Sequence, residues 1–559
     1  MTATVEQIKH HDMPRPIVIP IAMLWNIVIL VGSVFVAQRI FATDTIIDVR
    51  DLGTPVQYFL ALAALLPGAA AVYSTYHLFQ DRPNGRLMAM GINYVGMVLA
   101  SFMLLKQWGV FIGFDVVSQK IFENAQWLLG IALAYAIFYI AGRIDEDSLW
   151  HDRIEKLSLG IGMLSLLLLL ITANAIDGAM SILNTYSNIN TWFITGAVIV
   201  FGVLAWMMKN TGEYFGETPA QRSVWEGWLF LSPNLIGFMI FFAGPLLLSF
   251  YLAFTNSTGV TVPDFVGLGN YQEILGLQFR MQDDPTLSAQ QALDRGFVEL
   301  TTINLGDNRL VVGARDALFW LSLRNTLLFV ILVVPLAGIP ALGLAMILNS
   351  KLPGMKFYRA IFFLPSVAAV VGTALIWRNL YNVQVGFINY TISEIIQFVN
   401  STFGANWHDP RIQWLSDPNF QLISIVILGA WTVMGFNTVL FLAGLQGIPK
   451  SLYEAAYVDG ANGWQRFRNV TVPMLAPTTF FVVITTVING LQVFNEPFTL
   501  ISSRPMPVNA STAVYYLYTR GFERFEFGYA SSVAWIVFII IFAVTLLQFR
   551  FSRSTAYED

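Results

Sequence analysis

The chain has 559 residues, a net charge of −4 at pH 7, no cysteine, 56% hydrophobic residues and 12% charged residues. A surface this apolar would aggregate in water, so most of the chain is expected to lie in a lipid bilayer. The lack of cysteine excludes disulfide bridges, cysteine-based metal sites and thiol nucleophiles. The five histidines form no metal-like cluster, and no basic patch is extensive enough to indicate nucleic-acid binding.

Apolar stretches long enough to cross a bilayer as helices follow one another along the whole chain. They form two sets of six, so the sequence predicts an all-α polytopic membrane protein with about twelve transmembrane helices. The first set lies at 17–38, 55–79, 87–105, 126–141, 157–172 and 190–208, and the second at 227–254, 319–349, 357–380, 419–445, 474–501 and 528–549.

Three regions follow from this division. Residues 1–210 form an N-terminal membrane extension of about six helices, residues 211–226 form a polar linker, and residues 227–552 form a six-helix core. Twelve spans place both termini on one side, and the segments on that side hold more Lys and Arg. The bias predicts that this side, with the linker, is cytoplasmic and that the long loop 255–318 is outside.

A compact polar loop, residues 446–473, separates two apolar stretches of the core on the cytoplasmic side. Ser451 and Glu454 have the spacing of a capping box, which predicts a short helix from about Leu452 to Asp459. Gly460 is expected to stop this helix, and a second amphipathic helix should begin at residues 464–468. The residue pattern of this loop alone is compatible with two interpretations. The loop is either a knob that fills a cleft on a partner or an ordinary pair of interfacial helices.

The motif within this loop resembles the EAA loop of binding-protein-dependent ABC importer permeases. Its residues are Glu454-Ala455-Ala456, then Gly460, then Val470-x-Val472-Pro473. The family usually has Ile and Leu at the two valine positions, and both changes keep an apolar residue. Residues 225–552 also resemble the carbohydrate, maltose-type branch in stretches that include Leu231-Ser232-Pro233-Asn234, Phe362-Phe363-Leu364-Pro365, Gly386-Phe387-Ile388-Asn389 and Leu445-Gln446-Gly447-Ile448-Pro449.

The resemblance implies a transmembrane permease subunit of an ATP-driven importer, which forms half of the pathway for a sugar or oligosaccharide and works by alternating access. The implied partners are a second permease subunit, two copies of a cytoplasmic ABC ATPase, an extracellular solute-binding protein and membrane lipid. The chain itself is expected to be no enzyme and to hold no cofactor, because it lacks a G-x-x-x-x-G-K-[ST] phosphate loop. The residues implied in ATPase coupling are Glu454, Ala455, Ala456, Asp459, Gly460 and Pro473.

Further expectations concern location and the outer loop. The resemblance implies a multi-pass protein of a bacterial or archaeal cytoplasmic (inner) membrane, with both termini in the cytoplasm, and ATP and Mg bound on the ATPase subunits. The excess length near 276–313 in the outer loop would either contact the solute-binding protein or be a solvated insertion. The N-terminal extension contains no buried ionisable cluster, which favours a scaffold or lateral-contact role over a second transport path.

A neutral sugar in a membrane cavity needs aromatic faces for its apolar ring surface and amides for its hydroxyl groups. Asn489, Gln492 and Glu496 are spaced i, i+3, i+7, so they are expected to share one helix face. The predicted substrate pathway is Phe436, Asn437, Asn489, Gln492 and Phe494. Each amide has the alternative of bonding one helix to another.

Two other groups near the pathway have structural interpretations. Trp377 and Tyr381 have the positions of aromatic-belt anchors, and Arg378 and Glu496 are expected to form an ion pair.

Two alternative functions remain open from the sequence. An ABC permease for another solute, such as a polyol or glycerol phosphate, is one, and a cavity richer in Arg and Lys would favour the phosphate. A stand-alone secondary transporter is the other, and it would leave the pattern around Glu454 unexplained.

Overall fold

The computed structural model describes residues 14–41, 54–110, 125–142, 149–172, 180, 182–259, 263–283, 288–306, 308–350, 354–501, 503–504 and 507–555. The chain divides into two compact units, Met1–Phe241 and Phe242–Asp559. The helical segment from Pro219 to Leu252 crosses this division and contains a π-helical turn, η3 (Met239–Ala243). The regions expected at 1–210, 211–226 and 227–552 stay a prediction.

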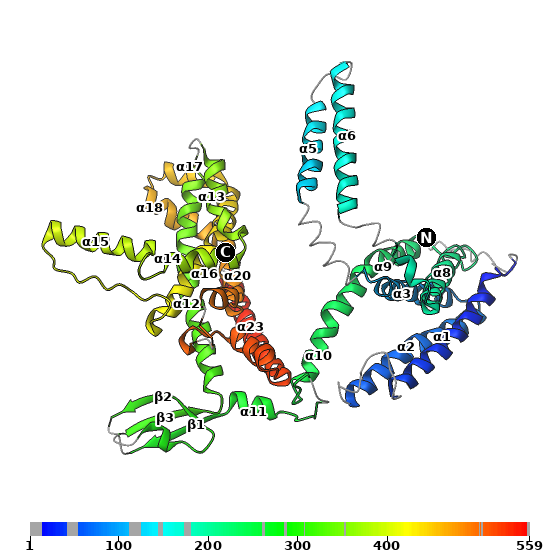
Figure 1. The fold of residues 1–559 in the computed structure, drawn as a ribbon, viewed down its shortest axis with the longest axis horizontal. Helices are drawn as coiled ribbons and strands as arrows, with labels where there is room; N and C mark the ends of the chain where they lie inside the picture. Colours follow the sequence, from blue (N-terminus) through cyan, green and yellow to red (C-terminus); the bar gives the residue numbers. More distant parts are fainter. Residues whose placement is uncertain are drawn as a thin grey trace. The chain divides into compact units, whose positions relative to one another are not determined.

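Unit 1 is made of long apolar helices in pairs (Figure 1). In the first pair, Asn26 Nδ2 donates to Ser74 Oγ at 3.2 Å, and that hydroxyl donates to the Gly85 carbonyl oxygen at 3.0 Å. In another pair, Ser158 Oγ donates to the Ala134 carbonyl oxygen at 2.7 Å. The described helices are α1 (Val18–Phe41), α2 (Thr54–Phe79), α3 (Pro83–Gln107), α5 (Ala125–Ala141), α6 (Leu149–Thr172), α8 (Ile189–Lys209) and α9 (Pro219–Phe238).

A buried arginine ties three elements of unit 1 together. Arg86 of α3 donates from Nε to the Met208 carbonyl oxygen at 2.9 Å and from Nη2 to the Lys209 carbonyl oxygen at 2.8 Å. These are carbonyls at the C-terminal end of α8 that have no partner within the helix. Nη1 of Arg86 pairs with Glu217 Oε1 at 2.9 Å, and Trp225 Nε1 of α9 also donates to Glu217. The guanidinium therefore joins α3, the end of α8 and the loop before α9.

The charge state of Glu217 strengthens this junction. Burial alone would raise the pKa of Glu217, but hydrogen bonds from Arg86 and Trp225, with the positive charge of Arg86, outweigh burial and bring the pKa below its ordinary value. A carboxylate whose pKa is lowered by folding stabilises the fold above its unfolded-state pKa, and this stabilisation is lost as the pH falls through the lowered value. The ion pair is therefore fully formed at neutral pH.

Unit 2 contains a helical core, a three-stranded sheet and a chain of short helices. Its elements are α10 (Gly244–Leu252), α11 (Gly269–Leu275), β1 (Leu277–Gln282), η4 (Ala289–Ala292), β2 (Val298–Leu305), β3 (Asn308–Ala314), α12 (Ala317–Leu348), α13 (Met355–Val367), α14 (Val370–Leu380), α15 (Phe387–Phe403), α16 (Pro418–Gly447), α17 (Lys450–Val458), α18 (Gly463–Arg466), η5 (Phe467–Thr471), α19 (Val472–Met474), α20 (Ala476–Leu491), α21 (Asn495–Leu500), η6 (Val508–Ala510), α22 (Ala513–Tyr518), η7 (Thr519–Glu523) and α23 (Phe527–Thr555).

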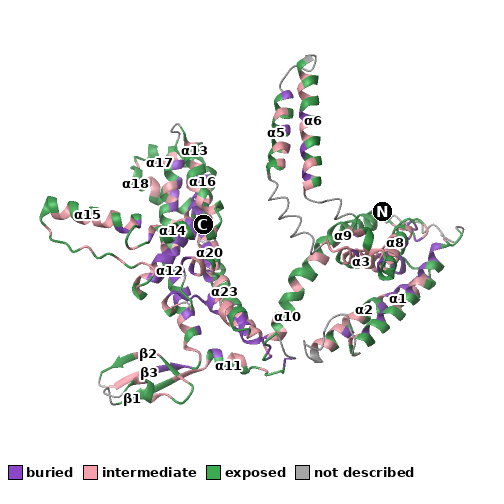
Figure 2. Ribbon diagram, viewed as in Figure 1, coloured by how far each residue is buried: buried purple, intermediate pink, exposed green. Residues whose placement is uncertain are grey.

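Helix α16 is the centre of this core, and buried residues gather where it meets α12 (Figure 2). Three glycines along it lie against three different helices. A Cβ atom on Gly429 would lie 2.7 Å from the Phe329 ring of α12, one on Gly435 would lie 2.5 Å from the carbonyl oxygen of Phe362 in α13, and one on Gly444 would lie 2.5 Å from a hydroxyl of α20. Membrane helices approach closely only where such small residues lie at the contact.

The fold class expected from the sequence, an all-α polytopic membrane protein, is confirmed. Among the described residues, eight helices are long and apolar enough to cross a membrane, or up to ten if each of two bent pairs is one span. Two expected spans are not straight. The stretch 357–380 is bent by 97° between α13 and α14, and the stretch 474–501 contains a 65° bend before α20, which itself ends at Leu491.

The loop 255–318 contains the one local exception to the helical fold that the described residues show. Strands β1, β3 and β2 form an antiparallel sheet in that order, which lies next to α11 (Figure 1). Val311, Val312 and Ala314 of the central strand are buried. The polar excess near 276–313 is therefore a folded insertion, and the sequence did not predict its strands.

Replacing Arg86 by Ala should open the junction between α3, α8 and α9. Glu217 would then be a largely buried carboxylate without its cation, which costs about 3–5 kcal/mol. We expect the backbone amides of residues 210–218 to exchange hydrogen for deuterium faster, as measured by mass spectrometry on the full chain. Arg82→Ala, which removes an exposed arginine from the residue before α3, should leave the exchange unchanged; equal exchange in both variants would contradict this role of Arg86.

Candidate functional site

The loop between α16 and α20 forms a helix–turn–helix knob. Helix α17 ends at Val458 with Asp459 as its C-cap, and the next residue, Gly460, has a φ of +79°, a left-handed conformation that favours glycine. The Gly460 amide donates to the Tyr457 carbonyl oxygen at 3.1 Å and the Ala461 amide donates to the Ala456 carbonyl oxygen at 2.9 Å. This pair of bonds is the Schellman motif, so the predicted helix stop at Gly460 is confirmed.

The predicted capping box at Ser451 and Glu454 is wrong. Helix α17 begins at Lys450 with Pro449 in the N-cap position and no side-chain cap, because Pro449 has an extended ψ of 131° and starts the helix before Ser451. A capping box occurs instead at the second helix, where Asn462 and Gln465 bond each other's backbone amides at 2.8 and 2.9 Å. Helix α18 thus begins at Gly463, next to the predicted position.

The exposed surface of the knob is strongly apolar, which the sequence pattern did not predict. Tyr457 is 71% exposed, Val458 is 84% exposed and Trp464 is 67% exposed. Tyr453 OH lies 3.0 Å from Thr471 Oγ1 and fastens α17 to η5, so this surface is held in one shape. The predicted coupling residues Glu454, Ala455, Asp459, Gly460 and Pro473 are exposed on the knob, and Ala456 is half-buried.

A polar pocket of about 210 Å³ lies between α12, α16 and the break that separates α20 from α21. Three of the predicted pathway residues, Asn489, Gln492 and Phe494, line it together with Asn495 and Glu496. They do not share one helix face as expected, because α20 ends at Leu491 and the backbone turns before α21 begins at Asn495. The turn aims these side chains into the same space.

The other two predicted pathway residues lie elsewhere. Asn437 is 1% exposed, and its Nδ2 donates to Thr486 Oγ1 at 3.3 Å, so it bonds α16 to α20. Phe436 is 44% exposed on α16 and is not among the lining residues. Spacing along a helix predicts which residues share a face but not which face meets a neighbouring helix.

The structure also corrects two structural expectations nearby. No ion pair among the described residues joins Arg378 to Glu496, and Arg378 is exposed. Tyr381 is only 1% exposed and donates from its hydroxyl to the Ser424 carbonyl oxygen at 3.1 Å, and its ring lies 5.5 Å from that of Trp377. This aromatic pair belongs to the core and does not anchor the protein at the membrane surface.

Comparison with known proteins decides the family. The model of the "binding-protein-dependent transport system inner membrane component" family matches residues 317–557. The chain is 32% identical over 329 residues to the probable ABC transporter permease protein YesP of Bacillus subtilis, a match that covers 58% of this chain and 90% of that protein. The chain belongs to this family of ABC transporter permeases.

The names of two further relatives of the permease state which solute they transport. The lactose transport system permease protein LacF of Rhizobium radiobacter is 30% identical over 331 residues, 59% of this chain and 94% of that protein. The trehalose/maltose transport system permease protein MalF of Thermococcus litoralis is 27% identical over 328 residues, 58% of this chain and 93% of that protein. The knob and the pocket of the permease both lie inside the range of the family match, and unit 1 lies outside it.

Proposed function

We propose that this permease is the membrane subunit of an ATP-driven importer for a neutral sugar or oligosaccharide. In this account it forms half of the translocation pathway, and the knob between α16 and α20 couples it to an ATPase subunit. The observation that carries the proposal is the exposed apolar surface of the knob, which lies at the motif that resembles the EAA loop. Val458 on this surface is 84% exposed, and an apolar patch in contact with water is unfavourable unless a partner covers it.

The pocket supports the class of solute. It is lined by the amides Asn489, Gln492 and Asn495, by the ring of Phe494 and by one carboxylate, Glu496, and none of its described lining residues is a cation. Amides donate hydrogen bonds to hydroxyl groups and accept them, and a carboxylate accepts them, whereas an anionic solute would need Arg or Lys. The lactose and trehalose/maltose transport named in two relatives agrees with this chemistry.

The size of the pocket supports a shared pathway. Its volume of about 210 Å³ is below the roughly 300 Å³ at which small-molecule sites begin. A second permease subunit would complete the cavity, and alternating access would open it to one side at a time. The further partners are two ATPase subunits, which bind ATP and Mg, and an extracellular solute-binding protein, for which the sheet β1–β3 offers a folded outer surface. The assembly would lie in a bacterial or archaeal inner membrane with both termini in the cytoplasm.

Val458→Asp should prevent the knob from docking on the ATPase. The substitution places a charge on the most exposed apolar side chain of the knob, and burying an unpaired charge costs several kcal/mol. We expect the ATPase subunit to be lost from the permease during affinity purification in detergent, with the amount of permease unchanged.

Val385→Asp is the matched control, since Val385 is 83% exposed and lies between α14 and α15, away from the knob. The ATPase should co-purify with this variant as with the natural chain. Full co-purification with Val458→Asp would refute the docking surface.

The double substitution Asn489→Leu and Gln492→Leu should strongly lower uptake without affecting the binding of the ATPase subunit. Each lost amide leaves sugar hydroxyl groups without a partner at a cost of about 1–3 kcal/mol, so uptake should fall by roughly tenfold or more. The measurement is uptake of radiolabelled lactose, maltose and trehalose by cells that carry the complete importer. Gln397→Leu, an exposed amide on α15, is the control. Unchanged uptake in the double variant would contradict the assignment of the pocket to the solute pathway. If the natural importer took up none of the three sugars, the proposed class of solute would be contradicted.

A further inference from the structure

Seven aromatic rings form a continuous series from the pocket to the start of α23. Phe494, which lines the pocket, has its ring centroid 5.1 Å from that of Tyr518, and Tyr518 lies 5.4 Å from Phe522. Phe522 lies 6.1 Å from Phe527, and Phe527 lies 6.4 Å from Phe525. We call this series the aromatic ladder; its members are Phe494, Phe498, Tyr515, Tyr518, Phe522, Phe525 and Phe527.

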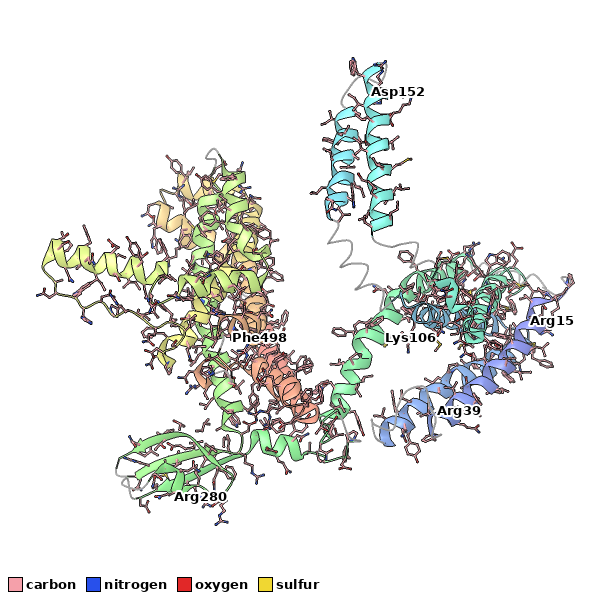
Figure 3. The ribbon with its side chains drawn as sticks, viewed as in Figure 1. Arg15, Arg39, Lys106, Asp152, Arg280 and Phe498 are labelled. Carbon is pink, nitrogen blue, oxygen red and sulfur yellow. The ribbon has the colours of Figure 1, made fainter. Side chains whose placement is uncertain are left out.

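The far end of the ladder is open to the surroundings, whereas its near end is enclosed. Phe522 is 59% exposed and Phe525 is 56% exposed, while Tyr515 is 2% exposed. Arg504 lies over the rings of Phe498 and Tyr515, with its guanidinium carbon 4.8 and 5.7 Å from their centroids. Phe498, labelled in Figure 3, has its ring centroid 5.1 Å from that of Phe494, which lines the pocket.

Charges next to the exposed rings show that this end does not lie in hydrocarbon. Residues 520–526 read Arg-Gly-Phe-Glu-Arg-Phe-Glu, and the charged side chains Glu523 and Arg524 are exposed beside the two exposed phenylalanines. Exposed charges at this density are expelled from a bilayer core. The segment is also joined to the start of the outer loop, since the Gly528 amide donates to the Ser257 carbonyl oxygen at 3.0 Å.

The exposed rings are held in place at a conformational cost. Phe525 has a φ of +59°, which is a strained conformation for a bulky side chain and marks functional positions when the surroundings enforce it. The Glu526 amide donates to the Arg520 carbonyl oxygen at 2.9 Å, and Arg520 Nε pairs with Glu526 Oε2 at 2.9 Å. The turn η7 next to Phe525 is π-helical, a form that is frequent at functional sites.

A second set of contacts fixes the turn to the rest of unit 2. The guanidinium carbon of Arg520 lies 3.9 Å from the ring centroid of Tyr529, and the hydroxyl groups of Tyr529 and Tyr516 both donate to Asp316. Asp316 also caps α12 by accepting from the Phe319 amide at 3.0 Å. The ladder is thus preorganised by a carboxylate at the junction of β3 and α12.

We propose that the aromatic ladder is a binding track for pyranose rings, along which a saccharide passes between the outer surface and the pocket. The axial C–H groups of a pyranose form an apolar face that matches the face of an aromatic ring, and rings with centroids 5.1 to 6.4 Å apart offer successive platforms. This proposal deepens the proposed function and rests on it. The occupant is the saccharide and not lipid, because the track begins among charged residues and ends in a pocket of amides.

Saturation-transfer difference NMR on the full chain in nanodiscs tests the track, with maltotetraose as the probe. Irradiation of the aromatic protons should transfer saturation to the axial C–H protons of the sugar. Phe522→Ala with Phe525→Ala should lower this transfer by about a third, because two of the seven platforms are lost. Phe522→Tyr with Phe525→Tyr should restore it.

Phe538→Ala with Phe542→Ala is the matched control, since these rings on α23 are 52% and 54% exposed and stack on each other outside the ladder. No transfer with the natural chain, no loss in the first variant, or an equal loss in the control would each overturn the track. Because this assay needs neither ATP nor partner subunits, its failure is distinct from a failure of the uptake experiment, which would overturn the proposed function.

A spin label separates the saccharide track from a lipid-facing belt. The chain has no cysteine, so a nitroxide can be attached at Phe522→Cys alone. The label should be more accessible to a water-soluble nickel reagent than to oxygen, which concentrates in lipid. The reverse order would place the ring in the bilayer and overturn the proposal.

Discussion

The close packing of α16 is the constraint on which both sites of the permease core depend. Without Cβ atoms, Gly429, Gly435 and Gly444 let α12, α13 and α20 approach a single helix from different directions. Gly429 and Val433 of that helix line the pocket, and the knob begins directly after its last residue. A rigid helix with the pocket on its side and the knob at its end is a physical means of transmitting movement at the knob to the pocket.

Local chemistry made some features predictable from the sequence. The long apolar stretches predicted membrane helices, because hydrocarbon length fixes their composition, and Gly460 predicted a helix stop, because only a residue without Cβ adopts its conformation cheaply. Asn489, Gln492 and Phe494 were predicted because sugar recognition requires amides and rings, and they line the pocket.

Other features depend on contacts between distant segments, which periodicity cannot predict. Asn437 bonds α20 and does not face the pocket, since the sequence does not say which helix lies opposite each face. Ser451 lies inside the first helix because Pro449 starts it early. The sheet near 276–313 has mixed polar and apolar residues on strands paired across the loop, and the aromatic ladder joins α21, α22 and α23. Both become visible only in three dimensions.

The central claim is that a partner at the knob controls access to the pocket, and cysteine labelling in the assembled importer tests it most directly. Since the chain has no cysteine, Asn489→Cys is the single target in this chain for a membrane-impermeant maleimide added from outside to proteoliposomes, and its labelling is followed on the band of this subunit. Labelling should be roughly tenfold faster with ATP and vanadate than without nucleotide, as expected for a conformational bias of about 1.4 kcal/mol or more, and adding Val458→Asp should abolish this difference. Labelling that is independent of nucleotide in the intact importer would contradict the account.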